Sequence, residues 1–188
     1  MPKIIVDIEN RIFEEAKAIF SEKGYHKTDM KAIAKACEIA VGTLYNYYPN
    51  KKMIYMDVFI KSWDETIRKI KLVRKRADKK AELREVMVIF YADVEDRNGL
   101  GNDLRELCKK GDKEFDKTAR VVLDQLFDVT LSRFNIKEEF ENIKDIEFRI
   151  LVIWFAGQFA MMSDFSTDRE ENINFLYSTV SAYFNLKN

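Results

Sequence analysis

The chain has 188 residues, of which 47% are hydrophobic and 34% charged, with six glycines and two prolines. So few breakers among so many helix formers favour an all-α fold over a sheet protein. The formal net charge is zero, but residues 1–80 hold 18 Lys and Arg against 11 Asp and Glu (+7), whereas residues 81–188 hold 14 against 21 (−7). A basic N-terminal part indicates a nucleic-acid partner at that end.

The N-terminal part predicts three short helices followed by a long one. Apolar residues recur at helical spacing, and stop or capping signals separate the segments: Gly24 after the first, Thr28 or Asp29 before the second, Asn50 before the fourth. The predicted helices span residues 8–23, 30–37, 40–47 and 51–76.

The second and third of these helices are joined by a tight turn, which is the arrangement of a helix-turn-helix. The third offers small and hydroxylated side chains at its start, aromatic hydroxyls along it and lysines after its end. Such a surface suits base edges and phosphates, so we expect this helix to enter the DNA major groove. Tyr45 and Tyr47 lie two residues apart and cannot both face one core, so at least one should be exposed. The basic run 68–76 is a solvated face, a second approach to phosphates or a segment that separates the two domains.

The C-terminal part predicts five further helices and a polar stretch, 135–144, that forms a loop with one helical turn. The five span about 81–97, 103–110, 112–134, 145–164 and 168–186. We expect a domain boundary near the start of the long helix, which gives a DNA-binding domain of residues 1–50 and a helical domain of residues 51–188.

The predicted helix 145–164 is apolar on nearly every side in its middle, so all of its faces need cover. Two helices of a second chain would supply it in a two-fold four-helix interface, and a single central core helix is the alternative. The residues we expect at such an interface are Phe155, Ala156, Phe159, Ala160, Tyr177, Val180 and Phe184.

The run Gly42-Thr43-Leu44-Tyr45-Asn46-Tyr47-Tyr48-Pro49-Asn50-Lys51, with Gly24-Tyr25 and Ile33-Ala34 before it, resembles the tetracycline-repressor (TetR) family of bacterial transcription regulators. The resemblance covers about residues 8–60. It implies a homodimer whose two recognition helices enter successive major grooves of a palindromic double-stranded DNA operator, and a C-terminal domain for ligand binding and dimerisation.

The resemblance also assigns roles to seven residues. Three lie at the start of the recognition helix, where the family contacts base edges, and four occupy positions that reach phosphates. The first three are Val41, Gly42 and Thr43, and the other four are Thr28, Tyr45, Tyr47 and Lys51.

Two residues depart from the family pattern. Glu38 stands at the turn where Gly is usual, and a non-glycine residue in the left-handed conformation costs about 1–2 kcal/mol. Ala40 stands where Ser often caps the recognition helix, and a missing cap costs about 0.5–2 kcal/mol. The start of that helix has no Arg, Asn or Gln, so sequence specificity is either modest there or rests on DNA shape and on arms such as Lys3 and Arg11.

The aromatic and apolar residues of the C-terminal domain indicate a pocket for a small hydrophobic ligand that regulates the protein. Each of these residues is also a plausible core residue. The candidates for lining a pocket are Trp63, Met87, Phe90, Tyr91, Leu104, Cys108, Phe127, Trp154 and Gln158. We therefore expect a repressor that such a molecule releases from DNA. The alternative is a DNA-binding regulator without an inducer, controlled by a protein partner.

No enzyme is predicted, because no nucleophile, base and orienting group occur in a recognisable pattern. Cys37 and Cys108 lie far apart and His26 is the single histidine, so neither a disulfide framework nor a metal site is expected, and no cofactor. No signal peptide is visible, and the most apolar stretch, 150–162, is short of the roughly 20 residues of a membrane span. We expect a cytoplasmic protein.

Overall fold

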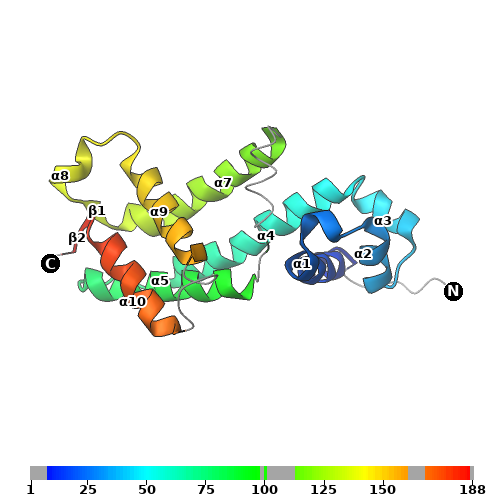
Figure 1. Cartoon of the computed structure of the whole chain (residues 1–188), viewed down its shortest axis with the longest axis horizontal. Coiled ribbons are helices and arrows are strands. Elements are labelled where there is room, and N and C mark those ends of the chain that lie inside the picture. The colour runs from blue at the N-terminus through cyan, green and yellow to red at the C-terminus, as the bar shows by residue number, and fades with distance from the viewer. Residues whose placement is uncertain (1–7, 98–99, 101–112, 161–167, 187–188) are drawn as a thin grey trace. The chain divides into compact units, whose positions relative to one another are not determined.

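The computed structural model of the chain describes residues 8–97, 100, 113–160 and 168–186. This part contains nine α-helices and one pair of very short strands, so the predicted all-α class is confirmed (Figure 1). The chain divides into two compact units: a first unit of residues 1–63 and 97–120, and a second unit of residues 64–96 and 121–188. The division differs from the predicted boundary at residue 50, because the first half of the long helix is part of the first unit's core.

In the first unit, α1 (Ile8–Lys27), α2 (Met30–Ala36) and α3 (Val41–Tyr47) gather around the beginning of α4 (Lys51–Leu72) (Figure 1). Gly24 interrupts α1 with φ 75° and ψ 173°, at the predicted stop. The predicted caps are also present. The Asp29 carboxylate accepts a hydrogen bond from the Ala32 amide at 2.7 Å, and the Asn50 side chain accepts one from the Met53 amide at 3.0 Å.

The core of the first unit is apolar and aromatic. Its buried side chains follow the helical spacing that predicted α1, α2 and α4, and they include Ile12, Ala16, Phe20, Ile33, Ala34, Leu44, Ile54, Tyr55 and Val58. Phe115, near the start of α7 (Lys113–Thr130), is 1% exposed and joins this core through edge-to-face contacts with the rings of Tyr25 and Tyr55. The packing is therefore carried by burial of apolar surface.

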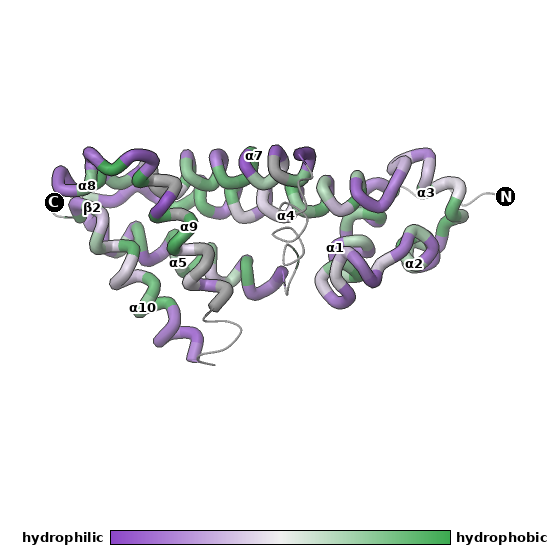
Figure 2. The backbone as a smooth tube through the Cα atoms, turned by 45° about the horizontal axis from the view of Figure 1, so that its top comes forward, coloured by the Kyte–Doolittle hydropathy of each residue, from purple (hydrophilic) through white to green (hydrophobic). Residues whose placement is uncertain are grey.

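The second unit is built from α5 (Lys79–Asp96), α9 (Ile146–Ala160) and α10 (Arg169–Ser181), with the rest of α7. The last helix, α10, packs on both α5 and α9. Gly157 permits the close approach of α9 and α10, because a Cβ atom there would lie 2.9 Å from Leu176 Cδ2. Figure 2 shows α7 with hydrophobic residues along one side and hydrophilic residues along the other. Val122 and Leu126 on its apolar side are buried, as their spacing predicted.

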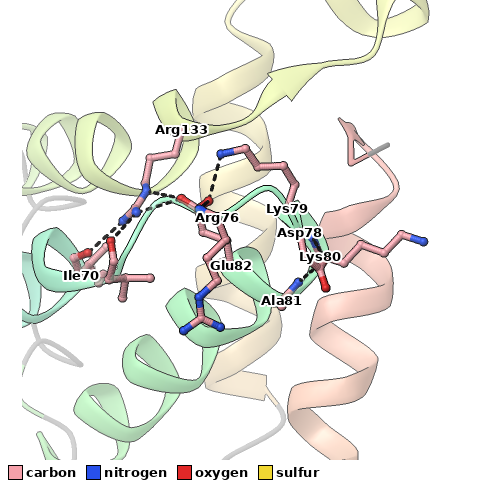
Figure 3. A network of polar contacts seen from close by, with 9 residues as sticks. Ile70, Arg76, Asp78, Lys79, Lys80, Ala81, Glu82 and Arg133 are labelled. Atoms are coloured by element: carbon pink, nitrogen blue, oxygen red, sulfur yellow. Dashed lines mark hydrogen bonds and ion pairs between the residues drawn. The ribbon is translucent and has the colours of Figure 1, made fainter. Parts of the chain in front are cut away.

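A buried carboxylate ties the end of α4 to the start of α5 and to the 3-10 turn Leu131–Arg133 (Figure 3). Glu82 is fully buried and accepts hydrogen bonds from the Arg76 amide, the Lys79 ammonium and the Arg133 guanidinium, each at 2.9 Å. Arg133 also donates to the carbonyls of Ile70 (2.9 Å) and Val73 (2.6 Å). The Arg133 side chain thus donates hydrogen bonds to carbonyls at the C-terminus of α4, where carbonyls have no donor within the helix.

Two predicted helices extend too far at their C-terminal ends, and one predicted loop contains a strand. α4 ends at Leu72 rather than near residue 76, and Asp78 caps α5 through hydrogen bonds from the amides of Lys80 and Ala81. The stretch 135–144 contains the predicted helical turn, α8 (Glu138–Glu141), but also the strand β1 (Asn135–Ile136). β1 pairs antiparallel with β2 (Phe184–Asn185), where a helix was expected. Beside this pair of strands the Phe184 ring is buried against the Phe134 ring, which is packing between residues far apart in the sequence.

The predicted helix 103–110 and the end of the predicted helix 145–164 lie outside the described residues.

Candidate nucleic-acid interface

The turn between α2 and α3 has the left-handed backbone that the resemblance implied. Glu38 has φ 52° although it is not a glycine. The Glu38 amide donates to the Lys35 carbonyl and the Ile39 amide to the Ala34 carbonyl, both at 3.0 Å, which closes the end of α2. The turn is therefore formed with a strained residue, at a cost of about 1–2 kcal/mol.

The negative charge of the Glu38 side chain, which would repel DNA phosphates, is balanced by an ion pair. Its carboxylate pairs with the Arg11 guanidinium at 3.1 Å, and 71% of the Glu38 side chain is exposed. The neighbouring Cys37 thiol is buried against the Arg11 carbonyl, and burial raises the pKa of that thiol. Arg11, expected as an arm toward DNA, instead neutralises the carboxylate at the turn. Lys3 lies outside the described residues.

The recognition helix α3 is anchored by one side chain, Leu44, which is fully buried. Ala40 occupies the N-cap position in an extended conformation without a side-chain cap, as predicted. Gly42 is exposed, and a Cβ atom there would meet nothing within 4 Å. The protein's own packing therefore does not require a glycine at this position. Val41 and Thr43 are half-buried beside it.

Both tyrosines of α3 are exposed, Tyr45 at 47% and Tyr47 at 40%, which confirms that they do not share a core. Gly42, Tyr45 and Asn46 are spaced by three and four residues, so they form one exposed face of the helix. Asn46 was not predicted as a contact, because base-reading side chains were expected only at the start of the helix. The four-residue step from Gly42 would have found it.

Tyr48 was not predicted to have a role, yet it fixes the end of α3. Its hydroxyl donates a hydrogen bond to the Asp57 carboxylate of α4, which also pairs with Lys61 at 2.9 Å. Burial and the Asp57 carboxylate raise the pKa of Tyr48 well above its usual range. The four-residue step from buried Leu44 to Tyr48 was the available signal for this packing.

Lys51 and Thr28 serve the architecture of the first unit. The Lys51 ammonium donates to the carbonyls of Tyr25 (2.7 Å) and Thr28 (2.8 Å) and lies 4.3 Å from the centre of the Tyr25 ring. Two of its three donors are thus used, and one remains for a phosphate. Thr28 is 2% exposed and its hydroxyl donates to the Gly24 carbonyl at 2.7 Å. The Thr28 side chain therefore closes the end of α1. Its hydroxyl is buried, so it is out of reach of a phosphate.

The pocket candidates fall into two groups. Trp63 is buried in the first unit beneath the Arg97 guanidinium, at 3.8 Å from the ring centre. In the second unit, the Phe90 and Trp154 rings lie 4.5 Å apart, and the fully buried Gln158 side chain donates to the Tyr91 carbonyl at 3.2 Å. The remaining candidates are placed as follows: Met87 buried, Phe127 half-buried, Leu104 and Cys108 outside the described residues.

The residues expected at a dimer interface are in part core residues. Val180 and Phe184 are 1% and 2% exposed in a single chain, so their side chains have no surface to offer a partner. Tyr177 is half-buried, and the side chains of Phe155, Ala156, Phe159 and Ala160 lie outside the described part. Among the described side chains of α9 and α10, the large apolar ones that are exposed are Val152, Ile153 and Phe175.

Other kinds of site have little support in the described part of the chain. No three His, Cys, Asp or Glu side chains gather there as metal ligands would. None of the helices in that part is long and apolar enough to cross a membrane.

Comparison with known proteins identifies the first unit. Residues 12–56 match the family described as bacterial regulatory proteins, tetR family. The chain is 26% identical over 116 residues to YuxN of Bacillus subtilis, an HTH-type transcriptional regulator, and 37% identical over 57 residues to the regulator UidR of Escherichia coli. These alignments cover 61% and 30% of this chain, but only 40% of YuxN and 29% of UidR.

The fold of solved structures extends the likeness over nearly the whole chain. A tetR-family regulator from Streptomyces coelicolor superposes with a TM-score of 0.75 at 17% identity, covering 92% of this chain and 80% of its own. FadR of Bacillus subtilis, solved in complex with stearoyl-CoA, gives a TM-score of 0.70 at 18% identity, covering 92% and 97%. Together with the helix-turn-helix geometry of α2 and α3, these matches show that residues 12–56 form a DNA-binding domain of the tetR family of bacterial regulatory proteins, and that the chain as a whole has the fold of tetR-family regulators.

Proposed function

We propose that this chain is a repressor that binds a palindromic operator as a homodimer and leaves it when a small hydrophobic ligand binds the second unit. The observation that carries the proposal is the face of α3 on which Gly42, Tyr45 and Asn46 are exposed, with no packing of the first unit that requires the glycine. Repression by such a protein needs only occupancy of the operator, so no catalytic group is required.

Base reading and phosphate binding would divide along α3. An asparagine amide can make two hydrogen bonds to an adenine edge, and the Thr43 methyl and Val41 can contact thymine methyls. The hydroxyls of Tyr45 and Tyr47 and the remaining donor of Lys51 suit phosphate oxygens, which set register without reading sequence. The bare backbone at Gly42 would let α3 approach the DNA closely.

Dimerisation has its support in the exposed apolar residues of the second unit. Val152 and Ile153 of α9 are 43% and 42% exposed, and Phe175 of α10 is 54% exposed. Large apolar side chains on two neighbouring helices favour association with the same surface of a second copy, because a two-fold interface buries identical patches together.

Ligand binding has its support in the aromatic cluster of the second unit. Phe90 and Trp154 provide apolar surface there, and Tyr91 and Gln158 provide polar groups among them. Because FadR of Bacillus subtilis, which shares the fold, was solved with stearoyl-CoA, a long-chain acyl thioester is the first ligand to test. Release from the operator requires a coupling of about 1–3 kcal/mol between the two sites.

A second candidate function is a DNA-binding regulator controlled by a protein partner instead of a small molecule. The observation in its favour is α8, which exposes Glu138, Glu139 and Glu141 in the acidic part of the chain. A basic partner would suit this surface. Titrating the protein–operator complex with stearoyl-CoA and other lipophilic compounds separates the two candidates, because the second predicts no change in operator affinity.

The DNA-binding proposal is tested by selecting duplexes from a random pool and measuring their affinity by fluorescence anisotropy. Removing the Tyr45 hydroxyl (Tyr45→Phe) should weaken binding to every sequence by about tenfold to a hundredfold, since a hydrogen bond to a charged group contributes about 1.5–3 kcal/mol. Tyr183→Phe, which removes the same atom in the second unit, is the matched control and should bind as the wild type does. Equal affinities for Tyr45→Phe and the control would exclude Tyr45 as a phosphate contact.

Asn46→Ala should behave differently, because a base contact discriminates between sequences. It should lower affinity for the selected duplex by about tenfold or more, and change affinity for random DNA little. Uniform loss on both duplexes would instead identify Asn46 as a phosphate contact.

A further inference from the structure

The first turns of α7 belong to the first unit and lie beside the two lysines that begin α4. Phe115 is 1% exposed, and its ring centre lies 5.8 Å from that of Tyr25. The preceding residue, Glu114, pairs with the Lys52 ammonium at 2.5 Å, and this ammonium also lies 5.2 Å from the centre of the Phe115 ring. Glu114 and Phe115 of α7 therefore both lie beside the start of α4, where Lys51 and Lys52 are found.

Tyr25 connects Phe115 to Lys51. The Tyr25 carbonyl accepts a hydrogen bond from the Lys51 ammonium at 2.7 Å, and the Tyr25 ring lies 4.3 Å from the same ammonium. On its other side the ring packs edge-to-face against Tyr55, with centres 5.0 Å apart. The place of the Lys51 ammonium is thus set by Tyr25, and the place of Tyr25 is set by the aromatic cluster that Phe115 completes.

We propose that Phe115 is a positioning residue for DNA binding: the docking of its ring on Tyr25 places the Lys51 ammonium for its phosphate. This inference rests on the proposed DNA-binding function and extends it to a helix outside the helix-turn-helix. α7 continues beyond Arg120 into the second unit, so its first turns are where a change in α7 would alter the grip on DNA. Packed aromatic contacts transmit such changes because they shift between discrete arrangements.

Glu114 has the opposite effect on the same surface. Its carboxylate neutralises Lys52 while α7 is docked, and the Glu114 side chain is 72% exposed. The substitution Glu114→Gln removes one negative charge beside the Lys52 ammonium. The expected result is higher affinity for random-sequence DNA and a steeper dependence of affinity on salt, by about one charge.

The test combines Phe115→Leu and Lys51→Ala in the full chain. Binding is measured on a duplex that the wild-type protein selects from a random pool. Each single variant should lose affinity, Phe115→Leu by about threefold to tenfold. The double variant should bind no more weakly than Lys51→Ala alone, because Phe115 acts through Lys51 and the two losses are then not additive.

Val122→Ala is the matched control, since Val122 is 2% exposed on the same helix but belongs to the second unit. It removes apolar packing without touching Tyr25, so it should lower thermal stability and leave affinity unchanged. A loss of affinity in Val122→Ala equal to that in Phe115→Leu would attribute both to general destabilisation and overturn the inference. Wild-type affinity in Phe115→Leu, or additive losses in the double variant, would overturn it as well.

Hydrogen–deuterium exchange without DNA separates this inference from the proposed function. Amides in peptides covering residues 20–30 should exchange faster than in the wild type in Phe115→Leu and in Lys51→Ala. In Val122→Ala their exchange rate should equal that of the wild type. If exchange behaves so but the wild-type protein selects no duplex, the positioning of Lys51 stands and the DNA-binding proposal fails. If the wild type selects a duplex but Phe115→Leu leaves exchange unchanged, the positioning role fails and the DNA-binding proposal stands.

Discussion

The two units differ in where they hold the carboxylates of their ion pairs. In the first unit the ion pairs Arg11–Glu38 and Lys52–Glu114 each include a carboxylate whose side chain is more than two-thirds exposed. In the second unit Glu82 is fully buried and Asp93 is 7% exposed. An exposed pair contributes little and opens easily, whereas a buried charge must keep its partners. The first unit is thus suited to exchanging ion partners with DNA, and the second to holding a fixed geometry.

Asp93 illustrates the second case beside Glu82. Its carboxylate accepts hydrogen bonds from the Thr66 hydroxyl (2.8 Å) and from the Lys69 ammonium (2.6 Å), so it joins α5 to the second half of α4. Lys69 belongs to the basic run 68–76. One member of this run is therefore committed to a buried carboxylate, and Arg76 pairs with Glu85 at 2.5 Å.

The comparison predicts that removing a partner from the Glu82 network has the largest effect on stability. Arg133→Met should lower the free energy of unfolding by about 3–5 kcal/mol, because it leaves a buried carboxylate with fewer donors and two carbonyls of α4 without their partner. Urea denaturation of the full chain measures this. Arg84→Met is the matched control: Arg84 pairs with Glu170 on the surface, so its loss should cost about 0–1 kcal/mol. Equal costs for the two variants would contradict the comparison.

The same network predicts how stability depends on pH. Burial alone raises the pKa of Glu82, but the Arg76 amide, the Lys79 ammonium and the Arg133 guanidinium outweigh it and hold the pKa below its ordinary value of 4.5. A carboxyl whose pKa is lowered on folding stabilises the fold above its unfolded pKa and loses that contribution as pH falls through its folded pKa. The wild type should therefore exceed Glu82→Gln in stability by a constant amount above about pH 5, and by less as the pH falls below 4.5.

The sequence predicted most of the first unit because its features are local. Gly24 as a stop, Asp29 and Asn50 as caps, and the left-handed turn at Glu38 each depend on a few neighbouring residues, and each is present. The second unit depends on residues far apart in the chain. The pairing of Asn135 with Asn185 and the contact of Arg133 with Glu82 leave no periodic trace in the sequence.

The candidate site was predicted to the extent that exposure follows helical spacing. Tyr45 and Tyr47 are exposed as expected, but Thr28 is buried and Lys51 is engaged by two carbonyls. A resemblance assigns a residue type to a position. It does not show which backbone groups that residue satisfies before DNA arrives.

Glu38 offers a way to sharpen the comparison within the first unit. Glu38→Gly should stabilise the fold by up to about 1 kcal/mol, because glycine adopts φ 52° without the steric cost, and it should raise affinity for all DNA by removing a carboxylate. Thermal unfolding and anisotropy measure the two effects. Asp145→Gly is the matched control, since Asp145 has φ 54° in the second unit, and it should gain stability without any change in affinity. Glu38→Gln keeps the strain, so it should raise affinity alone.

Gly42 should show the clearest opposition between stability and DNA binding. Gly42→Ala should stabilise the fold by up to about 1 kcal/mol, because alanine favours helix and the added Cβ meets nothing within 4 Å. The same methyl group would stand between α3 and the DNA backbone or base edges, so affinity for the selected duplex should fall. Ser178→Ala, at an exposed site of α10, is the control and should leave affinity unchanged. A Gly42→Ala protein that is more stable and binds DNA as tightly as the wild type would show that α3 does not approach DNA through this face. In that case the recognition surface would have to be sought on the side of Val41 and Thr43.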